Sequence, residues 1–306
     1  MRATYHNHTT WSDGKASVEE LVAHARRLGV NELGISDHLT LPPAGEPPRW
    51  SMCSDDLPAY VEEVAAYGFD ADMPVRLGIE LDWFDSQESQ LREVVNRFPF
   101  DYIVGSVHFV GRFPVDGNPH RWDALTQDDI DAIHRGYWER MARMAASGIF
   151  TIAAHLDLPK KFNHHPSTQP WDVILPALDA LAAAKVVVEL NTSGWAKACE
   201  DAYPSEEILR ACCERSIAVT LSADAHDPLH LLRDFGRGAE RLQAAGYNRI
   251  ARFMNRRIRF DVIDESVIEL PEPPAVETTV NAEDTPGGRD GDDDQHDAAA
   301  PGQYAH

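Results

Sequence analysis

Short apolar runs alternate with longer amphipathic stretches along the first 270 residues of the chain. The short runs have the length of β-strands, and strands are predicted at residues 3–8, 32–36, 75–81, 102–107, 149–154, 186–190 and 218–222. The longer stretches place apolar residues at helical spacing, and helices are predicted at 17–28, 55–67, about 86–97, 126–147, 171–184, 205–215 and 228–245. Strands followed regularly by helices predict an α/β domain of parallel strands, either a barrel or a wound sheet.

The first predicted helix has a clear start signal. Ser17 precedes the apolar pattern and Glu20 follows three residues later, which is the spacing of a capping box. We therefore expect this helix to begin directly after Ser17.

No repeat of fixed period and no internal linker interrupts the pattern, so residues 1–270 are predicted to form one domain. Residues 271–306 differ, since they are rich in Pro, Gly, Asp and Ala and hold nine acidic residues and one arginine. Such a segment cannot bury enough apolar surface to offset the entropy of ordering it. We expect a disordered acidic tail there, with a solvating role favoured by its composition over a docking role.

The chain is strongly acidic, with 28 Lys and Arg, 50 Asp and Glu, and a formal net charge of −22. Nucleic-acid binding depends on a basic surface, so this balance argues against it. No run approaches the roughly 18 apolar residues of a membrane span, and the N-terminus lacks the pattern of a signal peptide. The four cysteines show no CxxC spacing, which favours a reducing cytoplasm.

Polar side chains follow every predicted strand. The first strand carries His6 and His8 on one face and leads to Asp13, and the later strands are followed in turn by His38, Glu80, His108, His155, Asn191, and Asp224 with His226. Any one of these has an ordinary structural explanation, such as a capping aspartate or a packed histidine. Their occurrence after every strand has no such ordinary explanation. It indicates a functional site, because α/β enzymes place their sites at the carboxyl ends of strands.

Nine of these residues are predicted metal ligands: His6, His8, Asp13, His38, Glu80, His108, His155, Asp224 and His226. Nitrogen and oxygen ligands without a thiolate suit Zn²⁺, Mn²⁺ or Fe²⁺. Nine exceed what one or two ions need, so three divalent ions become plausible if a carboxylate bridges. A structural site is usually smaller and closed, which favours a hydrolytic centre that activates a water molecule.

The motifs that carry these residues resemble a known family. HxHTxxSDG, SDH, GIE, GSVHF, AHLD and SADAH occur in the order of the PHP (polymerase and histidinol phosphatase) superfamily over about residues 1–240. Three further stretches resemble its monofunctional histidinol-phosphate phosphatase branch: AHLDLPKKF from Ala154, ELNTSG from Glu189 and YPS from Tyr203. The resemblance implies a distorted TIM-like (β/α)7 barrel with a trinuclear site at the carboxyl-terminal rim of its strands.

The resemblance also implies a distribution of the ligands. His6, His8, Glu80 and Asp224 would hold one ion, and Glu80 would bridge it to a second ion held by His108 and His155. Asp13, His38 and His226 would hold the third.

The implied activity is metal-dependent hydrolysis of a phosphate monoester, with L-histidinol phosphate of histidine biosynthesis as the expected substrate. A metal-bridging hydroxide would attack phosphorus in line, so no phosphoenzyme is expected, and Glu80, Asp224 and His226 are the candidate catalytic residues. One alternative is a phosphatase or phosphoesterase for another small phosphorylated metabolite. Another is a metal-stabilised binding module without activity, against which the complete ligand set argues.

The candidates for binding the substrate are Lys160, Lys161, Asn191 and Lys197. For each lysine, the alternative is a position in a solvated loop without a role in substrate binding. The chain departs here from the family pattern, because Trp195-Ala196-Lys197 stands where relatives usually have an arginine, and Lys160-Lys161 replaces a frequent Lys-Arg pair. An arginine binds phosphate with two parallel hydrogen bonds and a lysine does not, so the departure weakens the contact with phosphate that the resemblance implies.

Overall fold

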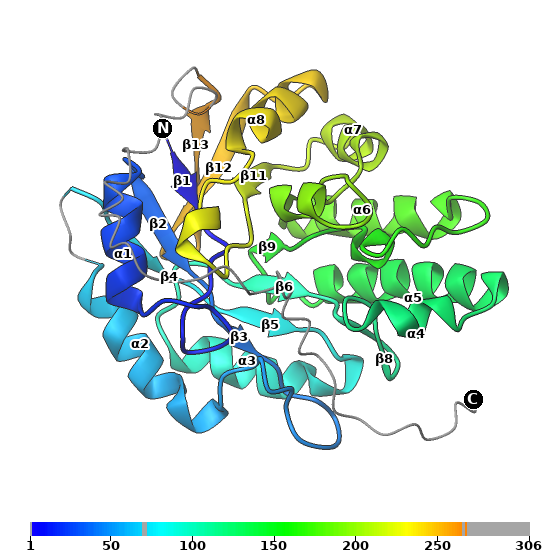
Figure 1. Cartoon of the computed structure of the whole chain (residues 1–306), viewed down its shortest axis with the longest axis horizontal. Helices are drawn as coiled ribbons and strands as arrows, with labels where there is room; N and C mark the ends of the chain where they lie inside the picture. The colour runs from blue at the N-terminus through cyan, green and yellow to red at the C-terminus, as the bar shows by residue number, and fades with distance from the viewer. Residues whose placement is uncertain (1, 69–71, 265–266, 268–306) are drawn as a thin grey trace, which may run out of the picture.

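Parallel strands occupy the middle of the molecule, and the helices α1 to α8 surround them (Figure 1). The computed structural model describes residues 2–68, 72–264 and 267. The strands are β1 (Ala3–Thr4), β2 (Glu32–Ile35), β3 (His38–Leu39), β4 (Val75–Leu77), β5 (Glu80–Asp82), β6 (Val104–Ser106), β7 (Phe109–Val110), β8 (Phe113–Pro114), β9 (Ile152–Ala153), β10 (Val187–Asn191), β11 (Val219–Ser222), β12 (Arg249–Met254) and β13 (Arg257–Val262).

The helices follow the strands in turn. The α-helices are α1 (Val18–Arg27), α2 (Leu57–Ala66), α3 (Glu88–Arg97), α4 (Pro119–Asp123), α5 (Gln127–Ala146), α6 (Trp171–Ala184), α7 (Glu206–Glu214) and α8 (Phe235–Ala244). The short 3₁₀-helices are η1 (Ser54–Asp56), η2 (Asp85–Gln87), η3 (Leu158–Lys160), η4 (Thr192–Ala196) and η5 (Pro228–His230).

Two sheets hold the parallel strands. One has the order β1-β2-β4, and the other has the order β11-β10-β9-β6-β5-β3. A parallel bridge between Asn7 and Ala225 links the segment after β1 to the segment after β11. In this bridge His8 N donates to Ala225 O over 2.9 Å, and Ala225 N donates to His6 O over 3.2 Å. The predicted α/β fold of parallel strands is confirmed.

Each predicted strand contains a parallel strand of the structure, but the run 75–81 is divided into β4 and β5. Gly78 and Ile79 separate the two strands, and the ring of Tyr102 packs against the backbone at this point. A Cβ on Gly78 would lie 2.2 Å from Tyr102 Cζ, so only glycine fits here. The break leaves Glu80 as the first residue of β5.

The antiparallel hairpin of β12 and β13 was not among the predicted strands. Its sequence mixes arginines with apolar residues, so it lacks the continuous apolar run of the parallel strands. Its Phe253 packs against Tyr5 at 4.9 Å and Tyr102 at 5.8 Å between ring centroids. These rings belong to a buried cluster that includes Ala3 and Val187, so the hairpin covers the amino-terminal ends of the strands.

Six of the seven predicted helices match an α-helix of the structure, and the short α4 (Pro119–Asp123) was not predicted. α1 begins after Ser17, whose hydroxyl accepts from Glu20 N while the Glu20 carboxylate accepts from Ser17 N, as the capping box predicts. The single helix predicted at 228–245 is wrong, because the chain forms η5 and then α8. Asp234 stands between them with a left-handed φ of 58°, which no continuous right-handed helix permits.

The predicted acidic tail at 271–306 lies outside the described residues, and so does the domain boundary at 270. Within the described part of the chain, no helix combines the length and the apolar character that crossing a membrane requires.

Candidate metal centre

The nine predicted ligands lie together at the carboxyl ends of the parallel strands. They form four overlapping groups, and within each group the potential ligand atoms lie within 4.8 Å of one another. The groups are His8, Asp13, His38 and His226; His6, Glu80 and His155; His6, His8 and Asp224; and His38, Glu80 and His108. Residues separated by more than 200 positions in the sequence therefore meet at one place.

Glu80 is the centre of this cluster, and it is almost completely buried. Its Oε2 lies 3.0 Å from His6 Nε2 and 2.8 Å from His38 Nδ1. Its Oε1 lies 3.3 Å from His155 Nε2 and 3.8 Å from His108 Nε2. The two oxygens thus face different pairs of imidazoles, which is the arrangement a bridging carboxylate needs.

The last strand and the first loop supply the other side of the cluster. Asp224 Oδ1 lies 3.4 Å from His6 Nε2 and 3.2 Å from His8 Nε2. Asp13 Oδ1 lies 3.3 Å from His226 Nε2 and 3.7 Å from His38 Nε2. The ring of His8 stacks between those of His226 and His38, with centroids 4.1 and 4.2 Å away.

Two of the ligand residues have a strained backbone. His155 and Asp224 have φ angles of 26° and 51°, which are uncommon for residues other than glycine. Each directs a side chain to the cluster from the end of a strand. Such strain persists only where the surrounding structure enforces it, and it is concentrated at functional sites.

Several buried polar atoms of the cluster have no hydrogen-bond partner in the described part of the chain. They are His8 Nδ1 and Nε2, Asp13 Oδ1, His155 Nδ1 and Asp224 Oδ1. Buried polar atoms are nearly always paired in folded proteins, so their concentration here requires a reason. Divalent cations accept imidazole nitrogens and carboxylate oxygens as ligands, and these residues fit such ions.

Burial and the charges of neighbouring residues shift the pKa values of several residues of the cluster. Burial alone raises the pKa of Glu80, but the positive charges of His38 and His6 bring it well below its usual value. Burial lowers the pKa of His108 and His226, but Asp82 raises the first to about 10 and Asp13 raises the second to about 9. Burial together with the charges of His226 and His38 lowers the pKa of His8 to about 3. A metal ion competes with protons for these imidazoles, so its affinity is expected to rise with pH.

The prediction from the sequence missed the carboxylates that orient the ligands. Glu189 Oε1 lies 2.8 Å from His6 Nδ1, and its Oε2 accepts from His155 N over 2.9 Å. Asp82 Oδ1 lies 2.8 Å from His108 Nδ1. These bonds direct Nε2 of His6 and of His108 toward Glu80. The available signal for Glu189 was an acidic residue inside the apolar run Val187-Val-Glu-Leu.

A tryptophan that the sequence did not single out borders the cluster. Trp50 lies in the loop between β3 and η1, half-buried. Its ring meets those of His38 and His108 edge to face, with centroids 4.7 and 5.4 Å away. The ring therefore forms part of the packing around these two imidazoles.

Lys160 is not placed to bind phosphate. Its ammonium contacts Asp157 Oδ2 at 2.9 Å, Asp201 Oδ2 at 2.8 Å and Ala202 O at 2.8 Å. An ammonium has three N–H donors, and all of them are engaged. We therefore assign Lys160 a structural role, in which it ties η3 to the segment before α7.

The other substrate-binding candidates differ among themselves. Asn191 is buried and its amide donates to Glu189 Oε2 and Asp224 Oδ2, so it orients carboxylates of the cluster. Lys161 donates to Asp116 O over 2.8 Å. Lys197 is exposed after η4. Lys161 and Lys197 remain candidates for phosphate binding.

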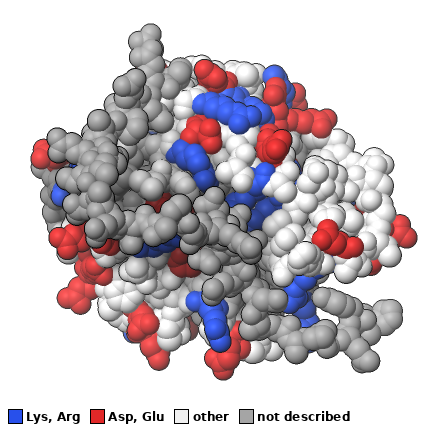
Figure 2. Space-filling model, viewed as in Figure 1, with Lys and Arg blue, Asp and Glu red and all other residues white. Residues whose placement is uncertain are grey.

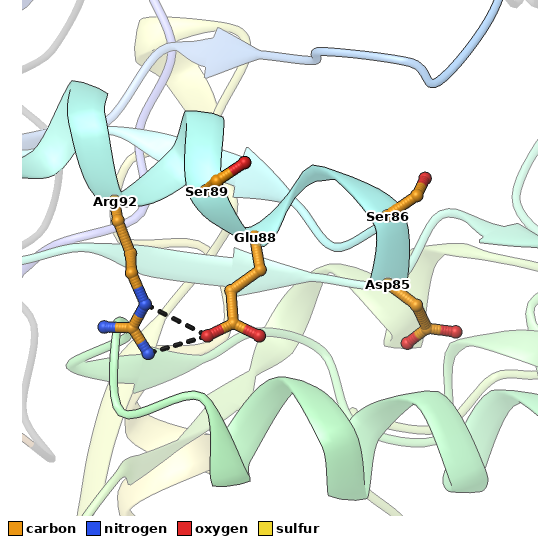
Figure 3. Close-up of a pocket in the computed structure, with 5 residues that line it drawn as sticks. All are labelled: Asp85, Ser86, Glu88, Ser89 and Arg92. Atoms are coloured by element: carbon orange, nitrogen blue, oxygen red, sulfur yellow. Dashed lines mark hydrogen bonds and ion pairs between the residues drawn. The ribbon is translucent and has the colours of Figure 1, made fainter.

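A separate surface hollow lies at the start of α3. It is lined by Asp85, Ser86, Glu88, Ser89 and Arg92, and Arg92 donates twice to Glu88 Oε1 (Figure 3). None of the nine ligands lines it. The hollow contains a paired arginine and no concentration of buried polar atoms, so we place no chemistry there.

Comparisons with known proteins show the family of the chain. A model of the PHP domain family matches residues 4–193. A protein of Deinococcus radiodurans named "Probable histidinol-phosphatase" is 33% identical over 242 residues, which cover 78% of this chain and 91% of that protein. A protein of Thermotoga maritima with the same name is 26% identical and is covered over 87% of its length.

A solved structure supports the fold. The crystal structure of a histidinol phosphate phosphatase from Lactococcus lactis, complexed with zinc, L-histidinol and phosphate, aligns with a TM-score of 0.72 at 19% identity. The alignment covers 84% of this chain and 98% of that one. At this identity the likeness concerns the α/β fold.

Proposed function

The chain belongs to the PHP domain family, and we propose that it is a metal-dependent phosphatase that hydrolyses L-histidinol phosphate to L-histidinol and phosphate. The observation that carries the proposal is the convergence of nine imidazole and carboxylate ligands at the ends of the strands. The name of the Deinococcus radiodurans relative supports the choice of substrate.

The proposal includes the finer architecture of the fold. We take the parallel strands as a distorted (β/α)7 barrel within one domain of residues 1–270. In this arrangement β2 and β3 form one interrupted strand, as do β4 and β5, and the neighbours follow as β6, β9, β10 and β11. The pairing order and the bridge between Asn7 and Ala225 support a closed ring.

Three divalent ions are proposed for the cluster, with Zn²⁺, Mn²⁺ and Fe²⁺ as candidates. His6, His8, Glu80 and Asp224 would hold the first, Glu80 with His108 and His155 the second, and Asp13, His38 and His226 the third. The four groups of converging atoms include all nine ligands and support a multinuclear cluster, and the division among three ions follows the resemblance to the family. Such ions would lower the pKa of a bound water molecule and offset negative charge on the phosphoryl oxygens.

The reaction needs one water molecule and the phosphate monoester. The oxygen of water forms a bond to phosphorus while the ester P–O bond breaks, and one proton of the water ends on the oxygen of L-histidinol. Glu80, Asp224 and His226 are the proposed catalytic residues, and no side chain becomes phosphorylated. Glu189 and Asp82 hold His6 and His108 with Nε2 toward Glu80, which fixes these ligands before the substrate arrives.

The substrate is a small phosphorylated metabolite, and we place its hydrolysis in the cytoplasm. Cys53, Cys199, Cys212 and Cys213 are all free thiols, in keeping with a reducing compartment.

The test is a substrate panel assayed with protein loaded with Mn²⁺ or Zn²⁺. L-histidinol phosphate is compared with other phosphorylated amino alcohols, sugar phosphates and nucleotides. We expect kcat/KM for L-histidinol phosphate to exceed the others at least about tenfold. A higher value for another monoester would assign a different substrate to the same site, and no hydrolysis of any monoester would favour the binding module without activity.

A further inference from the structure

The proposed substrate is a phosphate dianion, yet the chain has a formal net charge of −22. The dianion needs positive side chains near the cluster in addition to metal ions. Lys160 is fully engaged, as described above. Lys161 and Lys197 remain candidates, but neither can donate two parallel hydrogen bonds to phosphate as an arginine can.

A basic rim borders the cluster on the side of the last strand. We define it by Lys15, Lys197, His230 and Arg233, which follow β1, β10 and β11. Burial and the charge of Arg233 lower the pKa of His230, and Lys15 and Lys197 act in the same direction. Asp227, which lies 3.7 Å from Lys15 Nζ, acts in the opposite direction. Lys and Arg side chains lie near the middle of the face seen in Figure 2.

The basic rim adjoins the ligand residues through the backbone. Lys15 N donates to His226 O over 2.7 Å. Thr192, which directly follows Asn191, donates from Oγ1 to Arg233 O over 2.7 Å. Arg233 N donates in turn to His230 O over 3.0 Å. The end of β10 and the segment after β11 are thereby fixed relative to each other.

Arg233 differs from the other arginines of this region. Arg237 is exposed and stacks on Trp195 at 4.2 Å, and Arg241 contacts Asp201 at 3.2 Å. Arg233 is half-buried, and its Nε is buried without an acceptor among the described residues. A guanidinium with a buried donor and no carboxylate partner is suited to an anion that arrives from solution.

We propose that Arg233 binds the phosphate group of the substrate, with the remaining basic rim providing positive potential around it. The inference rests on the proposed phosphatase function and names the residue that gives it affinity for a phosphate monoester. The planar guanidinium offers parallel N–H donors to two phosphate oxygens, which Lys161 and Lys197 cannot do. It therefore provides at position 233 the two-donor contact that the loop at Trp195-Ala196-Lys197 lacks.

The test compares Arg233→Met and Arg233→Lys with the control Arg237→Met, which removes the same charge from an exposed position nearby. Binding of inorganic phosphate to the metal-loaded protein is measured by calorimetry, and KM and kcat are measured separately. Arg233→Met should weaken phosphate binding roughly 10- to 150-fold and raise KM more than it lowers kcat. The phosphate affinity and KM of Arg233→Lys should lie between those of the wild type and of Arg233→Met. For Arg237→Met both values should stay within about twofold of the wild type.

Metal content and melting temperature serve as checks on folding. If Arg233→Met does not fold, Arg233→Lys decides the question, because it retains the charge and loses only the two-donor geometry. Unchanged phosphate binding in the folded variants would overturn the inference, and so would an equal loss in Arg237→Met. Phosphate binding through Arg233 without turnover of L-histidinol phosphate would overturn the proposed substrate and leave the inference standing.

Discussion

The strands carry a buried charged cluster at each end, and the two clusters are built from different residues. At the amino-terminal ends, Glu32 accepts from Arg76 at 2.7 Å, from Arg252 at 2.6 Å and from the hydroxyl of Tyr5. At the carboxyl ends, the charged groups that face Glu80 and Asp224 are imidazoles, beside neutral donors from Ser106 and Asn191. The two arginine partners of Glu32 stay charged at any ordinary pH, whereas an imidazole can release its proton and become a neutral metal ligand.

This difference indicates that the cluster at the amino-terminal ends serves stability and that the cluster at the carboxyl ends serves function. The carboxylate of Glu32 has its charge balanced within the protein, and the arginine of β12 ties the covering hairpin to β2. The cluster at the carboxyl ends keeps buried nitrogens and oxygens that have no hydrogen-bond partner among the described residues. We therefore expect changes at the first end to alter folding and changes at the second to alter metal binding and catalysis.

The largest effect is expected for Glu80→Gln. An amide cannot bridge two cations, so kcat/KM should fall on the order of 10³-fold or more. Steady-state kinetics with metal analysis of the same preparation measures this. Turnover near that of the wild type would show that Glu80 is not a bridging ligand.

Glu32→Gln should lower the stability of the fold and not its metal binding. Removing the carboxylate takes a buried counterion from Arg76 and Arg252, although Arg252 keeps Asp261 at 3.0 Å, and the free energy of unfolding should fall by about 3–5 kcal/mol. Urea denaturation measures this, with Glu88→Gln as the control, because Glu88 pairs with Arg92 at the exposed surface. The control should lose less than about 1 kcal/mol. If Glu32→Gln instead lowered metal content at unchanged stability, the distinction between the two ends would be wrong.

Glu189→Gln should have an intermediate effect, confined to the carboxyl ends. Loss of the carboxylate that orients His6 should weaken metal affinity about 10- to 100-fold. Metal affinity is measured by competition with a chelator, and the melting temperature of the metal-free protein provides the control. An unchanged affinity would mean that the bond between Glu189 and His6 has no influence on the ligand.

The pH dependence of stability sharpens the comparison further. Burial raises the pKa of Glu32, but hydrogen bonds from Arg76, Arg252 and Tyr5 lower it below its usual value. Its contribution is therefore present above the pKa of the unfolded chain, about 4.3, and is lost as the pH falls through the lower folded value. The difference in unfolding free energy between wild type and Glu32→Gln should shrink below about pH 4. A difference that stays constant down to pH 3 would contradict this account.

Much of the centre could be predicted from the sequence, because each ligand follows an apolar strand and parallel strands end at one edge. The residues that orient the ligands could not be predicted, since Glu189 and Asp82 acquire their roles only when distant strands pair. The structural role of Lys160 could not be predicted either, because it depends on an ion pair with Asp201, 41 residues further along the chain. The hairpin of β12 and β13 was missed because its arginines conceal the strand pattern, although Arg252 pairs with Glu32 220 residues away.

The most direct test of the account is a metal titration of the stripped protein, followed by elemental analysis and turnover of L-histidinol phosphate. We predict that turnover rises with bound metal and reaches its maximum at about three ions per chain, because the nine ligands exceed what two ions need. Full activity with one ion per chain, or hydrolysis of L-histidinol phosphate by the metal-free protein, would contradict the trinuclear centre.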